Sequence, residues 1–218
     1  MQISATIYID VISSWCFWGS AAWLELQEQY RGRVSFGWKI ALMDASGMPA
    51  SYEQMEWFYR RSGMMMRSPF MLSSAWYEPG TNEFLPPNAV TEAARQMGVT
   101  DERVWLAFAH AGLREGRKTG DWDVAAEVGA TASGLPKDKL LERARSKEIE
   151  QLIRATTAEF HRLDVTQRPT FVLDTEIGDR AVFTGFARAA PIAAALDAML
   201  DDATAYAAHA AHFGQPPA

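Results

Sequence analysis

The sequence predicts an α/β protein whose sheet is built from two separate parts of the chain. The first observation is a strand–helix–strand pattern that ends near Ala41. The second is the lack of any strand pattern from there to Thr170, although helical patterns follow one another. The third is a strand–strand–helix pattern after that point. Together these patterns predict β-α-β and β-β-α halves with a large α-helical insert between them.

The first half begins with a predicted strand over Ser4–Val11, where SATIYIDV alternates and is rich in β-branched and aromatic residues. Helical spacing follows over Ser14–Tyr30, and Gly32 stands where a left-handed helix cap is common. A second strand is predicted over Val34–Ala41. The connection is long enough for a crossover, so we expect the two strands to be parallel.

The middle of the chain is predicted to be helical. Its segments are separated by Gly, Pro or Asp/Thr, and they cover Tyr52–Arg61, Ala89–Met97, Asp101–Glu115, Asp121–Thr131, Pro136–Arg145 and Lys147–Arg162. The stretch Ser73–Asn88 is too long and too rich in Pro and Gly for a simple connector. Loops of this kind are often functional lids.

The second half begins with a predicted strand over Thr170–Asp174. A turn at Gly178–Asp179 leads to another strand over Ala181–Thr184. An amphipathic, alanine-rich helix is predicted over Ala189–Ala211.

The order of these elements predicts a discontinuous first domain. We expect residues 1–42 and 164–213 to form this domain and residues 43–163 to form a helical domain inserted into it. Residues 214–218 are expected to be a flexible tail.

Composition and charge disfavour several classes of partner and cellular location. The net charge is −6 and acids and bases are interspersed, which disfavours a nucleic-acid partner. No apolar run is long enough to span a membrane, so no membrane partner is expected. The start MQISATIYIDVIS does not resemble a secretory signal, and we expect a cytoplasmic protein. With Cys16 as its single cysteine, the chain has no internal disulfide.

Three motifs occur in the order and spacing of a known superfamily. DVISSWCFWG ends the first strand, RPTFVLD opens the third strand with Pro169, and FTGFARAAPIAAAL places Gly185 before the last helix. With these motifs nearly the whole chain resembles the DsbA-like thioredoxin-fold superfamily. The resemblance implies a thioredoxin fold with an inserted helical domain, and a site of thiol chemistry at the start of the first helix.

Two branches of that superfamily differ at the first motif. DsbA-like and FrnE-like oxidoreductases carry C-x-x-C there, whereas kappa-class glutathione transferases and 2-hydroxychromene-2-carboxylate isomerases carry a serine in the first place. The motif here is SSWC, with Ser13 first and Cys16 last. The chain therefore combines the serine of the second branch with the W-C of the first.

Ser13 is the first candidate catalytic residue. A helix N-terminus stabilises an anion such as a thiolate. Serine without a base is a poor nucleophile. The resemblance instead implies that Ser13 donates a hydrogen bond to the sulfur of glutathione, or of a similar small thiol, and keeps it ionised. Serine is also a preferred helix N-cap, so a purely structural role is the alternative.

Cys16 is the second candidate catalytic residue. A dithiol cycle cannot run within one chain, because a serine replaces the first cysteine. A lone cysteine at this place is either a small buried core residue or, if exposed, a single reactive thiol that an external thiol resolves.

The remaining site candidates are expected to bind the cofactor thiol. Ser14 and Trp15 continue the motif. By resemblance, Pro169 is cis and lies against the helix start, and residue 168 offers its backbone to an extended ligand. The side chain of Arg168 either pairs with a ligand carboxylate or is solvated.

The resemblance also implies a site for the far end of the ligand. Gly185 and the residues after it, Phe186 to Arg188, would bind the γ-glutamyl end of a glutathione-like molecule, with Arg188 on its carboxylate. No glycine-rich nucleotide loop and no metal-ligand spacing occurs, and His209 with His212 is interpreted as a solvated pair.

Tryptophans and methionines are frequent between Trp15 and Tyr77. They either line an apolar pocket that faces the thiol site or pack the two domains together, and packing is the simpler interpretation.

Three functions remain open. The favoured one is an enzyme that uses a bound small thiol in a transferase or isomerase reaction on an apolar substrate. The alternatives are a thiol:disulfide oxidoreductase that acts through Cys16 alone and a non-catalytic binding protein. Fold analogy does not choose among them. A homodimer is expected because kappa-class relatives are typically dimers.

Overall fold

The structure, a computed structural model, describes residues 2–185 and 187–214. They form a four-stranded sheet in the order β2-β1-β3-β4, with strands at Ile3–Ile9 (β1), Val34–Ile40 (β2), Thr170–Thr175 (β3) and Arg180–Thr184 (β4). β1 is parallel to β2 and antiparallel to β3, and β3 is antiparallel to β4. The predicted fold class and the parallel crossover are confirmed.

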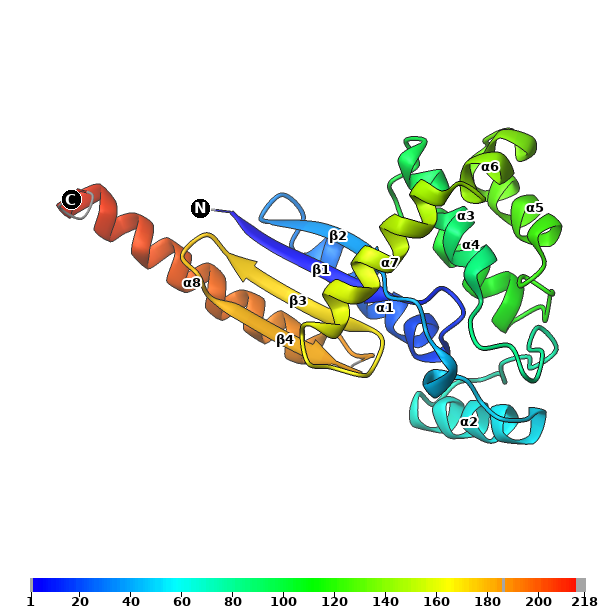
Figure 1. The fold of residues 1–218 in the computed structure, drawn as a ribbon. Coiled ribbons are helices and arrows are strands. Elements are labelled where there is room, and N and C mark those ends of the chain that lie inside the picture. The colour runs from blue at the N-terminus through cyan, green and yellow to red at the C-terminus, as the bar shows by residue number, and fades with distance from the viewer. Residues whose placement is uncertain (1, 186, 215–218) are drawn as a thin grey trace.

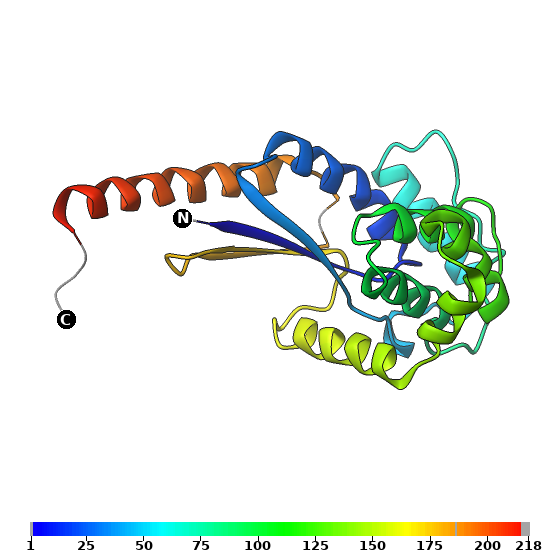
Figure 2. The same ribbon diagram turned by 90° about the horizontal axis from the view of Figure 1, so that it is seen from above.

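Helices cover both faces of the sheet (Figures 1 and 2). Helices α1 (Ser14–Gln29) and α8 (Ala190–Phe213) lie on one face, and α7 (Lys147–His161) lies on the other. Strand β3 is buried from Thr170 to Leu173, because both faces of its central part are covered.

The remaining helices gather beyond one end of the sheet, between β2 and α7 in the sequence (Figure 1). They are the 3₁₀ helix at Ala45–Gly47, α2 (Tyr52–Met65), α3 (Leu85–Gln96), α4 (Arg103–Leu113), α5 (Trp122–Ser133) and α6 (Lys137–Ala144). One cluster of buried apolar side chains runs from the sheet into these helices. The division into two domains stays a prediction.

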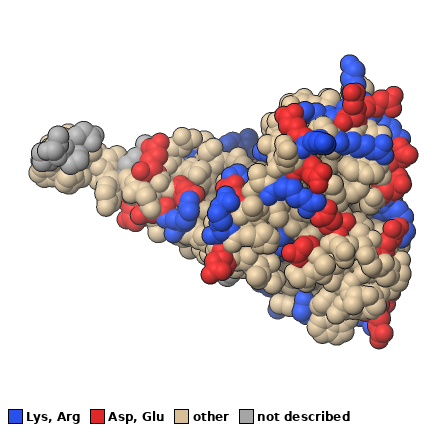
Figure 3. All heavy atoms as spheres, viewed as in Figure 1, with Lys and Arg blue, Asp and Glu red and all other residues tan. Residues whose placement is uncertain are grey.

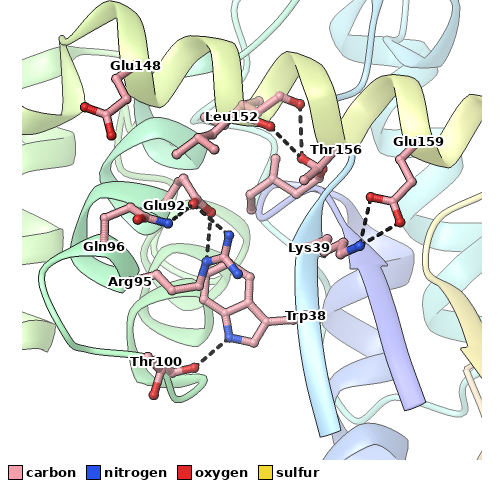
Figure 4. A network of polar contacts seen from close by, with 12 residues as sticks. Trp38, Lys39, Glu92, Arg95, Gln96, Thr100, Glu148, Leu152, Thr156 and Glu159 are labelled. Atoms are coloured by element: carbon pink, nitrogen blue, oxygen red, sulfur yellow. Dashed lines mark hydrogen bonds and ion pairs between the residues drawn. The ribbon is translucent and has the colours of Figure 1, made fainter. Parts of the chain in front are cut away.

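Polar contacts join the sheet to the inserted helices (Figure 4). Trp38 of β2 donates its indole N–H to the carbonyl of Thr100 at 3.0 Å, and the Arg95 guanidinium lies 4.9 Å from the Trp38 ring. Arg95 also pairs at 2.7 Å with Glu92, whose side chain is buried. This pair lies within α3 and positions the guanidinium of Arg95, whose contact with the Trp38 ring joins α3 to the edge strand β2.

A second set of contacts joins β2 to α7 (Figure 4). The Lys39 ammonium donates to both carboxylate oxygens of Glu159, at 2.6 and 2.8 Å. The Thr156 hydroxyl donates to the carbonyl of Ile40 at 2.6 Å. Helix α7 thus returns the chain to the sheet directly above the end of β2.

The stretch Ser73–Asn88 differs from its sequence-based prediction. Helix α3 begins at Leu85, four residues before the predicted start, with prolines in its first turn. Trp76, Tyr77 and Phe84 are buried, and Trp76 donates to the Tyr59 hydroxyl at 2.8 Å. The expectation of a lid is wrong for this stretch, because its aromatic rings belong to the core.

The described residues include no helix with the length and apolar character needed to cross a membrane.

Candidate functional site

The turn between β1 and α1 places the SSWC motif just beyond the carboxyl end of β1, an inner strand of the sheet. Ser13 is the N-cap of α1, with extended backbone angles, and its Oγ accepts the Cys16 N–H at 3.4 Å. The Ser13 N–H donates to the carbonyl of Asp10 at 3.0 Å. Local hydrogen bonds within the chain therefore hold both the side chain and the backbone N–H of Ser13.

A cavity of about 360 Å³ opens beside this turn. The turn itself, the segment that follows β2 and the segment that precedes β3 meet there, and residues of α2 together with Trp76 and His161 complete the wall. Four of the eight predicted site residues line the cavity, namely Ser13, Ser14, Trp15 and Arg168. The other four are absent from the lining that the described residues form, namely Cys16, Pro169, Gly185 and Arg188.

Cys16 lies behind the cavity wall and is 1% exposed. Burial raises the pKa of its thiol to about 12, against a smaller lowering by the hydrogen bond with Ser13. An attacking thiol needs the opposite conditions, access and a lowered pKa. The environment of Cys16 thus favours a thiol that stays protonated in the core.

Arg168 is half-buried rather than solvated. Its guanidinium donates to the carbonyls of Ala41 and Leu42, at 2.5 and 2.9 Å, and lies 4.3 Å from the ring of Phe160. Burial lowers the pKa of Arg168, and the nearby carboxylate of Asp10 opposes this effect. The side chain brings a positive charge to the cavity and also ties β2 to the start of β3.

The Arg168–Pro169 peptide bond is cis. The carbonyl of Pro169 accepts the N–H of Gly185 at 2.9 Å, so these two residues are joined to each other. No hydrogen bond to the backbone N–H or C=O of Arg168 occurs within residues 2–185 and 187–214. Its backbone donor and acceptor are therefore unpaired among these residues, and their binding of an extended ligand stays a prediction.

The far-end site differs in part from its prediction. Helix α8 begins at Ala190, so Arg188 precedes it, and the helix N–H groups lie farther along the chain than expected. Arg188 is exposed and Gly185 has a φ of 72°, in the left-handed region that favours glycine. Phe186 lies outside the described residues. A role for Gly185 and Arg188 in ligand binding stays a prediction.

Asp10 is a site residue that the sequence reasoning missed. Its carboxyl is fully buried and accepts N–H bonds from Ile12 at 3.0 Å and from Met43 at 2.8 Å. Burial raises the pKa of Asp10, and these two bonds and the charge of Arg168 act against the rise. The carboxyl bridges two walls of the cavity. The available signal was an acid that directly follows the first strand, three residues before Ser13.

Other polar groups of the cavity come from distant parts of the sequence. Asp44, Arg61 and His161 all contribute to its wall. The hydrogen bonds from Ser46 lower the pKa of Asp44. No local pattern marks these residues, since they share only their place in the folded chain.

The tryptophans and methionines of the first third of the chain divide into three groups. Some line the cavity: Trp15, Met43, Met48, Met55 and Trp76. Some belong to the core, including Trp23 and Trp38, and some are exposed on or near α2, namely Trp57, Met64, Met65 and Met71. Both interpretations of these residues, pocket and packing, therefore describe part of the set.

The described residues hold no group of three His, Cys, Asp or Glu side chains with the arrangement of a metal site. The polar groups of the cavity are suited to hydrogen bonding and to binding an anion.

Solved structures with this fold include proteins of thiol–disulfide chemistry. A candidate protein disulfide isomerase from Nitrosomonas europaea superposes with a TM-score of 0.76 at 14% identity, over 93% of this chain and 99% of that one. The cytosolic disulfide reductase DsbM from Pseudomonas aeruginosa superposes with a TM-score of 0.72 at 17% identity, over 91% and 98%. At these identities the likeness shows the fold.

The family comparison identifies the chain more closely. No curated protein matches the sequence. The family described as DSBA-like thioredoxin domain matches residues 5–197, nearly the whole chain. The protein therefore belongs to the DSBA-like thioredoxin domain family.

Proposed function

We propose that the protein is an enzyme that binds a small thiol, glutathione or a similar molecule, with the sulfur at Ser13, and uses it in a transferase or isomerase reaction. The observation that carries the proposal is the different position of the two motif residues. Ser13 caps α1 and lines the cavity with 6% of its surface exposed, whereas Cys16 is 1% exposed and is absent from the lining.

The hydrogen bonds of Ser13 leave its proton available. Its Oγ accepts from the Cys16 N–H, so the hydroxyl proton is not used in that bond. The proton would be donated to a ligand sulfur in place of the Cys16 thiol, whose pKa the hydrogen bond with Ser13 lowers. The dipole of α1 favours an anion at the same place. A charge-assisted hydrogen bond is worth roughly 1.5–3 kcal/mol, which corresponds to about one to two pKa units of the bound thiol.

The rest of the cavity supports an extended thiol ligand. The backbone of Arg168 offers one donor and one acceptor to a peptide-like molecule. Arg61 and Arg168 supply positive charge for carboxylates. A fold neighbour, DsbM from Pseudomonas aeruginosa, has been solved with GSH, at 16% identity and a TM-score of 0.70. Because that neighbour is described as cytosolic, we also infer a cytoplasmic location here.

An apolar wall faces the proposed thiol position. Met43, Met48 and Met55 contribute flexible side chains, and Phe58 and Trp76 contribute rings. A wall of this kind is suited to an apolar substrate that reacts with the bound thiol.

Disulfide reduction or oxidation through Cys16 alone is the second candidate, and family membership is the observation in its favour. It requires access to the sulfur of Cys16 and a thiolate near neutral pH. Burial and a pKa of about 12 oppose both requirements.

Calorimetric binding of glutathione and of S-methylglutathione tests the proposal. The methylated molecule keeps both carboxylates and the amine but has no ionisable thiol. The wild-type protein should bind glutathione more tightly than the methylated form, by roughly ten- to a hundredfold at about pH 9.5, where free glutathione is ionised, and by only about one- to fourfold at neutral pH. The Ser13→Ala variant should lose this preference.

Ser146→Ala is the matched control, because Ser146 caps α7 in the same way by accepting the Ile149 N–H at 3.4 Å. It loses a helix cap without changing the cavity and should keep the preference for glutathione. Equal binding of both ligands by the wild-type protein, or an unchanged preference in Ser13→Ala, would contradict the proposal.

A further inference from the structure

Helix α8 carries an apolar stripe, and the rest of the protein covers only the first part of it. Ile192, Leu196, Met199 and Ala203 are buried against the rest of the protein. From Thr204 to Gly214 every residue is exposed except Ala210, which is half-buried. Figures 1 and 2 show this part of α8 running past the end of the sheet.

The stripe continues in the projecting part with the same spacing. Tyr206, Ala210 and Phe213 follow Ala203 at steps of three, four and three residues, as in the heptads of a coiled coil. Tyr206 is 61% exposed and Phe213 is 70% exposed. No Lys, Arg, Asp or Glu occurs from Ala203 to Gly214, and this end of the helix is free of charged colour in Figure 3.

A projecting helical segment of this length needs a partner. Isolated helices shorter than about 12–15 residues are marginal in water, because packing of an apolar face supplies most helical stability. The heptad spacing indicates that the missing packing partner is another helix.

We propose that the projecting part of α8 pairs antiparallel with the same segment of a second copy of this chain. In one register the two stripes fit with large side chains against small ones. Tyr206 of one copy then faces Ala210 of the other, and Phe213 lies level with Ala203, where the covered part of the other copy's helix begins. The twofold axis repeats both contacts, so the interface is closed and self-complementary.

The charges of the helix agree with this orientation. Asp201 and Asp202 stand at the base of the projecting segment, and His209 and His212 stand near its tip. Antiparallel pairing brings the acidic base of one helix within about a turn of His212 of the other and within about one and a half turns of His209, and it also opposes the two helix dipoles. A parallel pair would instead place acid beside acid.

The size of the overlap sets the strength of the dimer. Residues 203–213 span about 16 Å of helix at 1.5 Å per residue. Two helices in contact over this length bury less than the roughly 800 Å² per partner of a standard interface. The pair is therefore a weak dimer whose population rises with protein concentration.

Sedimentation equilibrium over an about hundredfold range of protein concentration tests the proposal. The wild-type protein should shift from monomer to dimer. Ala210→Lys places a charge in the stripe and should leave a monomer throughout, with at least a tenfold weaker association. Ala208→Lys is the matched control, because Ala208 is exposed and lies outside the stripe, and it should associate like the wild-type protein.

Cross-linking tests the register. Tyr206→Cys and Ala210→Cys should each give little disulfide dimer alone, whereas an equimolar mixture should form the disulfide between Cys at 206 of one copy and at 210 of the other under mild oxidation. Cys16 is buried and does not interfere. A wild-type protein that stays monomeric at every concentration, or single variants that cross-link to themselves as parallel helices would, overturns the proposal.

Discussion

Replacement of Asp10 by asparagine tests the bridge between the two cavity walls. The carboxyl of Asp10 accepts one N–H bond on each oxygen, from Ile12 at 3.0 Å and from Met43 at 2.8 Å, and no part of the residue is exposed. Asparagine has the same shape but only one carbonyl oxygen. Its amide therefore presents a donor to one of the two backbone N–H groups, and one wall loses its hydrogen bond.

The cost follows from leaving one buried N–H without an acceptor. Such a group costs about 1–3 kcal/mol, so Asp10→Asn should lower the free energy of unfolding by that amount at neutral pH. Asp10→Ala removes both acceptors and should cost about twice as much. The exposed Asp179 supplies a control, and Asp179→Asn should change the free energy of unfolding little.

The pH dependence has a definite sign. The ordinary pKa of an aspartate is about 3.9, and burial raises the pKa of Asp10 above this value in the folded protein. At a pH between the ordinary pKa of the unfolded state and the raised pKa of the folded state, the folded protein holds a proton that the unfolded protein has released. The contribution of Asp10 to stability therefore falls as the pH rises. The asparagine side chain does not titrate. The destabilisation by Asp10→Asn should therefore be largest below about pH 4 and smaller at neutral pH.

Urea unfolding of the wild-type protein and of the variants, repeated across this pH range, gives the required free energies. An Asp10→Asn variant as stable as the wild-type protein, or a destabilisation that grows as the pH rises, would refute the reasoning about Asp10.

Two further predictions concern buried groups. Burial holds the pKa of Cys16 at about 12, so iodoacetamide should leave the native protein unmodified near neutral pH. Mass spectrometry should show full reaction only after unfolding. Rapid alkylation of the native protein would contradict this prediction. Glu92 is buried and pairs with Arg95 at 2.7 Å, so Glu92→Gln should lower the free energy of unfolding by about 1–3 kcal/mol. Glu28→Gln removes an exposed pair with Arg31 and should change the free energy of unfolding little. Similar losses in both variants would show that the burial of Glu92 adds nothing to the strength of its pair.

The fold could be predicted because its strands carry strong local patterns. Ser4–Val11 and Val34–Ala41 lie within two residues of the observed strands, since alternation and β-branched residues mark them. The start of α3 could not be placed in the same way. Leu85 and the prolines after it resemble a loop in sequence, yet proline is well tolerated in the first turn of a helix.

The site was predictable only where the chain itself brings residues together or a motif marks them. Ser13, Ser14 and Trp15 are adjacent, and Arg168 precedes the motif proline, so all four could be assigned to one place. Arg61 and His161 join the same cavity from α2 and α7, which are far apart in sequence. Their meeting depends on how the inserted helices pack, and no local pattern reports it.

The proposed helix pair rests on a different kind of pattern. The heptad spacing over Ile192–Phe213 is visible in the sequence, but its meaning depends on where the rest of the protein stops covering the helix. Only the structure shows that Met199 is buried and that Tyr206 is exposed on the same stripe.

The central claim is that Ser13 lowers the pKa of a bound thiol. Ultraviolet absorbance of the thiolate, measured against pH for glutathione bound to a molar excess of protein, gives that pKa directly. The wild-type protein should hold it about one to two units below the value of free glutathione, and Ser13→Ala should bring it back close to the free value. A bound thiol with the same pKa in the wild-type protein and in Ser13→Ala would contradict the claim.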